Sequence, residues 1–150
     1  MQIPKNFDKE STYGLYLQGR DLYRFRKYNL AEEKIKASLS KDELFFPSLV
    51  EMMKLKIFRM DYDAACHYGK KALSIDTYDG EANYYYGIIA SKLSKSNDAL
   101  DGFQVASLTP DYRVAAYTAL AHQYLGNNNY IKAEEYAKSS IKNKNIDLEK

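Results

Sequence analysis

The chain has 150 residues, of which 45% are apolar and 28% charged, as in an ordinary soluble globular domain. Its net charge of +2 is small and its lysines alternate with acidic residues, so the sequence lacks the clustered basic surface that nucleic-acid binding requires. No apolar run is long enough to span a bilayer, and a single cysteine excludes an intrachain disulfide. We therefore expect neither a nucleic-acid nor a membrane partner. The first six residues lack the apolar core of a signal peptide, which predicts a cytoplasmic location.

In chain order, the sequence predicts eight helices and no strands, which makes the chain all-α. The predicted helices cover residues 12–26, 28–40, 46–59, 62–74, 80–93, 96–107, 112–126 and 130–143. Pro47 suits a first helical turn, where its missing N–H costs nothing. The predicted helix caps are Asp61, Asp79, Ser96, Asp111 and Asn129. Residues 1–11 and 146–150 are expected to be loosely held tails.

A repeat of 34 residues runs through the whole chain. One series is alanine at all four positions: Ala31, Ala65, Ala99 and Ala133. Two further series, also 34 residues apart, consist mostly of small residues: Gly19, Met53, Gly87 and Ala121, and then Ser38, Ala72, Ala106 and Ser140. Small residues on facing helices allow close backbone approach, and stacked hairpins bury a continuous core. We therefore expect the following residues to pack within and between repeats: Gly19, Ala31, Ala65, Ala72, Gly87, Ala99, Ala106, Ala121 and Ala133.

This pattern resembles the tetratricopeptide repeat (TPR), a helix–turn–helix unit with a small residue late in its first helix and alanines in its second. The segments that carry the resemblance best are residues 62–76 and 129–135. The resemblance implies one right-handed superhelical α-solenoid of four repeats, near residues 12–45, 46–79, 80–111 and 112–145. Met53 and Ser96 depart from the family pattern, at a small position and at a turn tyrosine respectively.

A narrower resemblance concerns residues 72–87, 101–103 and 112–117. These segments are similar to the repeat region of large, uncharacterised bacterial proteins that also carry β-rich domains associated with carbohydrate. That resemblance implies an alternative role, as an accessory module cut from a larger carbohydrate-acting protein.

The 15 tyrosines are the unusual feature of the composition, since there are six Phe and no Trp. Tyrosine suits recognition surfaces as well as half-buried helix faces. In TPR proteins the first helices line a concave groove that holds the ligand, so the resemblance implies a protein or peptide partner there. The groove residues would be Tyr13, Tyr16, Arg20, Tyr23, Arg24, Lys54, Tyr84, Tyr85, Ile88 and His122. The alternative for each tyrosine is that it packs between repeats.

The sequence contains no catalytic or metal-binding constellation. His67 and His122 are far apart in the chain, and Cys66 is expected to be a small buried residue. We therefore predict a binding scaffold that is not an enzyme and needs no cofactor or metal. Self-association is a further hypothesis, because Ile141, Ile146 and Leu148 follow the last repeat with no hairpin to cover them. It would give a homodimer through the uncapped C-terminal helix.

Overall fold

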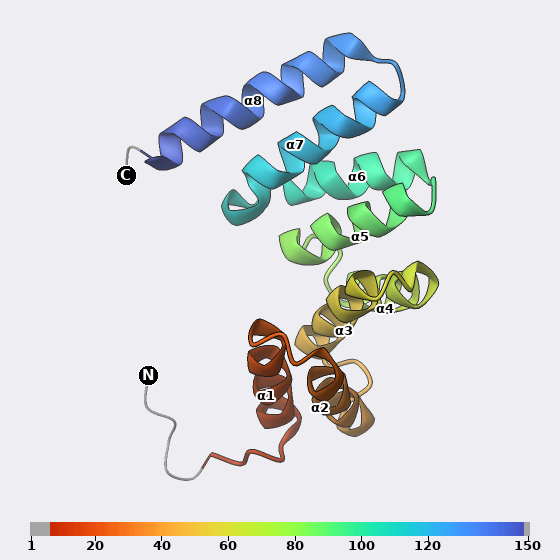
Figure 1. Cartoon of the computed structure of the whole chain (residues 1–150), viewed down its shortest axis with the longest axis vertical. Helices are drawn as coiled ribbons and strands as arrows, with labels where there is room; N and C mark the ends of the chain where they lie inside the picture. Colours follow the sequence, from red (N-terminus) through yellow and green to blue (C-terminus); the bar gives the residue numbers. More distant parts are fainter. Residues whose placement is uncertain (1–6, 149–150) are drawn as a thin grey trace. The chain divides into compact units, whose positions relative to one another are not determined.

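In a computed structural model, residues 7–148 are described, with side chains described as far as residue 144. This part of the chain contains eight helices and no strand, so the all-α prediction is confirmed (Figure 1). The helices are α1 (Thr12–Arg24), α2 (Tyr28–Lys41), α3 (Phe46–Phe58), α4 (Tyr62–Ile75), α5 (Gly80–Lys92), α6 (Ser96–Ala106), α7 (Pro110–Gly126) and α8 (Tyr130–Leu148).

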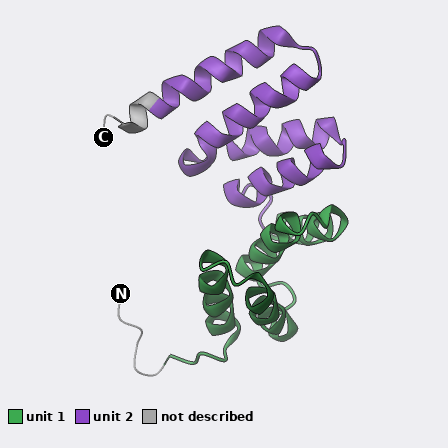
Figure 2. Cartoon of the chain, in the orientation of Figure 1, with its two compact units in different colours: residues 1–75 green, residues 76–150 purple. Residues whose placement is uncertain are grey.

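The helices form two compact units, residues 1–75 and 76–150 (Figure 2). In the first unit α1 pairs with α2 and α3 with α4, and the two hairpins pack through α2 and α3. The second unit repeats this arrangement: α5 pairs with α6, α7 with α8, and the hairpins pack through α6 and α7. Each unit is therefore a stack of two hairpins with its own core.

The small residues of the 34-residue repeat lie in these cores. Ala31 and Ala65 in the first unit and Ala99 and Ala106 in the second have no exposed surface. Ala72 and Ala133 are also buried, as are Gly19 and Gly87. The exception is Ala121, which is only half-buried and lines an open groove.

Within a hairpin, a small residue on one helix receives a large side chain from the other. A Cβ atom built on Gly19 would lie 2.5 Å from Cδ1 of Ile35, and one on Gly87 would lie 2.7 Å from the ring of Phe103. Position 53 carries the large residue instead, and Met53 is fully buried. The position equivalent to Ile35 and Phe103 is Gly69 in this hairpin. The large side chain is therefore on the first helix and the small residue on the second, the reverse of the first and third hairpins. The glycine at position 69 thus compensates for the large Met53 side chain at a position that is small in the other repeats.

Each hairpin turn contains one residue in the left-handed region, at Arg26, Met60, Ser94 and Asn128, with φ of 58–59°. These positions are themselves 34 residues apart. At every turn this residue donates its N–H to the carbonyl three residues back, and the next residue donates to the carbonyl five residues back, as in Arg26 to Tyr23 and Lys27 to Leu22. This is the Schellman arrangement, which usually has glycine at the left-handed position. Here none of the four is glycine.

We expect Ser94→Gly to raise the free energy of unfolding by roughly 0.5–1 kcal/mol. Glycine removes the Cβ strain of a left-handed residue, and this gain exceeds the entropy it adds to the unfolded chain. Thermal and urea unfolding of the purified chain measure the change. Asn128→Gly should gain less because Asn tolerates this conformation, and Ser94→Ala, which keeps the Cβ atom, should give no gain. Equal gains from Ser94→Ala and Ser94→Gly would contradict the argument.

Three of the predicted caps are present. The carboxylate of Asp79 accepts from the N–H of Ala82 at 2.7 Å, and the side chains of Asp61 and Asn129 accept in the same way at 3.2 Å. Pro47 lies in the first turn of α3, as predicted.

Two predicted caps are wrong. Ser96 is the first residue of α6, and Lys95 precedes it without a side-chain cap. The Ser96 hydroxyl instead accepts hydrogen bonds from the side chains of Gln123 on α7 and Asn127, the residue that follows α7. Asp111 lies inside the first turn of α7 because that helix begins at Pro110, whose fixed φ suits the first helical position.

The predicted tails also differ from the structure. Residues 8–11 are held against α1: the Ser11 hydroxyl donates to the Asp8 carbonyl at 2.7 Å and accepts from the N–H of Gly14 at 3.0 Å. The Gln18 side chain donates to the Lys9 carbonyl at 2.7 Å. At the other end α8 continues to Leu148, beyond the predicted end at residue 143. Residues 1–6 and 149–150 lie outside the described part.

Candidate protein-binding faces

An aromatic cluster lies where α1 meets the start of α3 in the first unit. The ring centroids of Tyr13 and Tyr16 are 5.9 Å apart, and that of Phe45 lies 6.5 Å from Tyr13 and 5.9 Å from Tyr16. Tyr13 is exposed, whereas Tyr16 is half-buried and packs on the core residues of this unit. Phe45 was not among the predicted site residues, since it precedes the predicted helix by one position.

Arg20 extends the cluster by one helical turn. Its guanidinium lies 5.6 Å from the centre of the Tyr16 ring, a cation–π distance. Nη2 lies 3.8 Å from the carboxylate of Asp21, while Nε is buried without a hydrogen-bond partner. A buried N–H without a partner lowers the stability of the fold at this point.

A second charged group lies along the same helices. Lys54 forms an ion pair with Glu51 at 2.8 Å, and its Nζ lies 5.5 Å from the centre of the Tyr23 ring. Glu51 is buried and its second carboxylate oxygen has no hydrogen-bond partner. Burial raises the pKa of Tyr23, Lys54 opposes that rise, and Glu51 and Tyr28 add to it. We call Tyr13, Tyr16, Phe45, Arg20, Tyr23, Glu51 and Lys54 the α1/α3 face.

Arg24 is exposed at the end of α1. The α1/α3 face thus brings together five of the six site residues predicted in this unit, namely Tyr13, Tyr16, Arg20, Tyr23 and Lys54. It adds Phe45 and Glu51.

In the second unit, three tyrosines gather between α5 and α7. The ring centroid of Tyr84 lies 5.4 Å from those of Tyr85 and Tyr112, and Tyr85 lies 6.5 Å from Tyr112. Tyr84 also contacts Phe103 of the core at 5.9 Å, and its burial raises its pKa. We call these three residues the α5/α7 face. Tyr112 was not predicted because only the fold brings it beside Tyr84.

The other two predicted residues of this unit do not join the α5/α7 face. Ile88 is half-buried and packs against the core of the unit. His122 is exposed and lines a groove of about 520 Å³ between α7 and α8. We call it the α7/α8 groove; its lining includes Thr118, Ala121, His122 and Leu125 of α7 and Tyr130, Ala133, Ala137 and Ile141 of α8.

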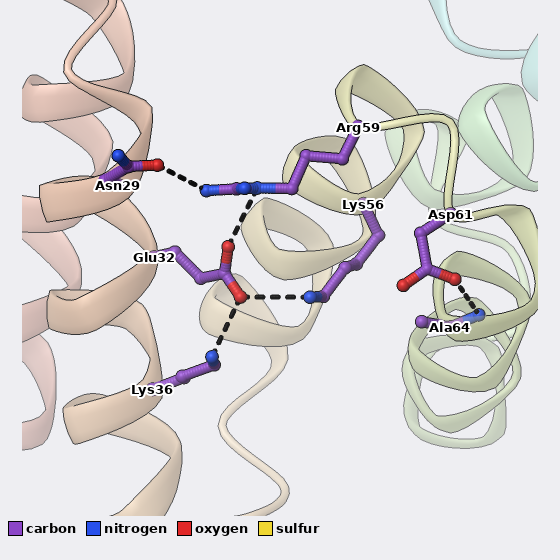
Figure 3. A network of polar contacts seen from close by, with 7 residues as sticks. All are labelled: Asn29, Glu32, Lys36, Lys56, Arg59, Asp61 and Ala64. Carbon is purple, nitrogen blue, oxygen red and sulfur yellow. Dashed lines mark hydrogen bonds and ion pairs between the residues drawn. The ribbon is translucent and has the colours of Figure 1, made fainter.

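A network of ion pairs surrounds Glu32 in the first unit (Figure 3). Oε1 of its buried carboxylate lies 2.9 Å from Nζ of both Lys36 and Lys56, and Oε2 lies 3.0 Å from Nε of Arg59. Arg59 also donates to the side chain of Asn29 at 2.7 Å. The network ties α2 to α3. Both carboxylate oxygens of Glu32 are paired, so we interpret this network as stabilising the fold and not as a ligand site.

The described residues include no group of three or more His, Cys, Asp or Glu side chains placed to hold a metal ion. Cys66 is buried, as predicted. Among the described helices, none has the length and apolar character needed to cross a bilayer.

No family model matches the sequence, and neither does any curated protein. Solved structures do match: a crystal structure of MamA superposes with a TM-score of 0.85 at 16% identity, over 95% of this chain and 84% of that one. MamA from Desulfovibrio magneticus RS-1 gives 0.81 at 14% identity, over 91% of this chain and 77% of that one. PilF from Pseudomonas aeruginosa gives 0.81 at 18% identity, over 90% of this chain and 62% of that one. MamA and PilF are TPR proteins, so the chain has the α-solenoid fold of tetratricopeptide-repeat proteins.

Proposed function

We propose that the chain is a non-catalytic scaffold that binds a protein or peptide, and that the α1/α3 face is its principal binding surface. Its fold is one whose surfaces are built by stacking helices rather than by placing catalytic groups. The observation that carries the proposal is the grouping of exposed and half-buried tyrosines with Arg20 and Lys54. Tyrosine and arginine dominate the energetics of protein interfaces.

The polar atoms of this face support a peptide ligand. The Arg20 side chain is 34% exposed and lies on the same helix as the exposed Tyr13. A peptide carries N–H and C=O groups along its whole length and can pair with guanidinium and hydroxyl groups of this kind. The α5/α7 face, with Tyr84, Tyr85 and Tyr112, is proposed as a second contact surface.

Two finer predictions belong to the same proposal. At the C-terminal helix, a second copy of the chain is proposed as a partner. The alternative of an accessory module within a larger carbohydrate-acting protein stays a prediction.

The test selects peptides from a random displayed library on the immobilised chain and measures their affinity for variants by fluorescence polarisation. Tyr13→Ala with Arg20→Gln should weaken the selected peptides at least about tenfold, because both changes remove interface anchors. A matched control, Tyr78→Ala with Lys70→Gln, changes an exposed tyrosine and an exposed lysine outside the α1/α3 face. Binding that is unaffected by the first pair, or lost equally with the control pair, would refute the proposal that the α1/α3 face is the binding surface.

A further inference from the structure

The α7/α8 groove exists because the last hairpin lacks the large side chain that fills the others. In the first and third hairpins Gly19 faces Ile35 and Gly87 faces Phe103. The equivalent positions in the last hairpin are Ala121 and Ala137, and both line the groove. The hollow between α7 and α8 therefore follows from a pair of small residues where the repeat requires one large residue.

The same surface also carries large apolar side chains that project from it. Leu125, Tyr130 and Ile141 line the groove and are 52%, 64% and 63% exposed. Along α8 the lining positions are 130, 133, 134, 137, 140 and 141, so each has another lining residue three or four positions away. Residues at this spacing lie on one face of a helix, and such a face can pack along another helix.

A surface that holds both a hollow and the apolar side chains to fill it is complementary to itself. Such a surface suits a two-fold interface, in which residue i contacts residue j of the partner and j contacts i. Charge does not oppose this, because Glu134, the one acidic residue of the lining, already forms an ion pair with Lys138 of the same helix and brings no unpaired carboxylate to the interface.

We propose that the α7/α8 groove binds the same groove of a second copy, with the two α8 helices crossing antiparallel at Ala137. This inference rests on the proposed self-association and specifies its site. An antiparallel crossing pairs residues equally far from its centre, so Ile141 of each copy lies opposite Ala133 of the other. The small side chain of Ala137 allows the helices to approach closely, and each Ile141 enters the partner's hollow.

Sedimentation velocity over a range of concentrations tests the assembly. The unmodified chain should show a monomer–dimer equilibrium, and Ala137→Arg should weaken it at least about 30-fold by placing a charge at the crossing. Ala137 is exposed on a helix, so this change leaves folding intact, which circular dichroism verifies. The matched control is Ile131→Arg: Ile131 is 75% exposed on the same helix but is not among the residues that line the groove.

Cross-linking tests the geometry. In a Cys66→Ala background, Ala137→Cys should be joined to itself by a short bis-maleimide, whereas Ile131→Cys should not. A strictly monomeric chain, equal dissociation by both arginine variants, or equal cross-linking at both positions would overturn the proposal. Peptide binding distinguishes this failure from failure of the scaffold function: Ala137→Arg should retain peptides selected on the α1/α3 face, and Tyr13→Ala with Arg20→Gln should retain the dimer.

Discussion

Replacement of Glu32 by glutamine (Glu32→Gln) is expected to lower the free energy of unfolding by roughly 2–3 kcal/mol at neutral pH. Glutamine keeps the size of the side chain but removes the charge that Lys36, Lys56 and Arg59 share. Lys56 is itself largely buried, so its ammonium group would lose its acidic partner inside the α2–α3 contact. A buried charge left without its partner costs far more than a lost surface ion pair.

The effect should depend on pH in a defined direction. Burial alone would raise the pKa of Glu32, but hydrogen bonds from Lys36 and Lys56 and their positive charges outweigh it and lower the pKa from 4.5 to about 2. Because the folded-state pKa is depressed, this carboxylate stabilises the fold above about pH 4.5, and the contribution is lost as the pH falls towards about 2. The stability difference between the unmodified chain and Glu32→Gln should therefore shrink on acidification.

Urea unfolding at a series of pH values measures that difference. Glu33→Gln is the matched control, because Glu33 is the exposed neighbour on the same helix. It should change stability by no more than about 0.5 kcal/mol at any pH. A Glu32→Gln deficit that stayed constant down to acidic pH would show that the carboxylate contributes shape and not charge.

The helices and their packing residues could be predicted because the repeat is a local signal. Four alanines at one period, with small residues at two others, fix which helix faces meet without knowledge of distant contacts. The turn residues could not be recognised in this way. The left-handed positions at Arg26, Met60 and Ser94 have ordinary side chains, and only the backbone hydrogen bonds show that they form one repeated turn.

The candidate site was only partly predictable, for a different reason. The α1 residues of the α1/α3 face follow from helical spacing, but Phe45 and Glu51 join them only through the α1–α3 contact. His122 occupies the same repeat position as Ile88, so sequence places both in one groove. The fold separates them: Ile88 packs against the core, whereas no further hairpin in the described part of the chain covers His122. Ile146 and Leu148, predicted to be uncovered with Ile141, have side chains outside the described residues.

The second large effect is expected at Gly102 of α6, which lies directly against the backbone of α5. A Cβ atom at this position would lie 2.9 Å from the carbonyl oxygen of Asn83 and 3.1 Å from the backbone N of Gly87. These are backbone atoms of α5, so they cannot give way as the end of a flexible side chain can. Gly102→Ala should therefore lower the free energy of unfolding by roughly 1–3 kcal/mol, even though Ala favours a helix by about 1 kcal/mol over Gly.

The decisive comparison is with a second glycine in the same unit, because the same substitution should then have the opposite sign. Gly126 ends α7, and a Cβ atom there would meet no atom within 4 Å. Gly126→Ala should raise the free energy of unfolding by about 0.5–1 kcal/mol, since only the backbone entropy of the unfolded chain changes. Urea unfolding measures both variants, and hydrogen exchange should locate the loss from Gly102→Ala in α5 to α8. A Gly102→Ala variant as stable as Gly126→Ala would mean that α5 and α6 can separate at little cost.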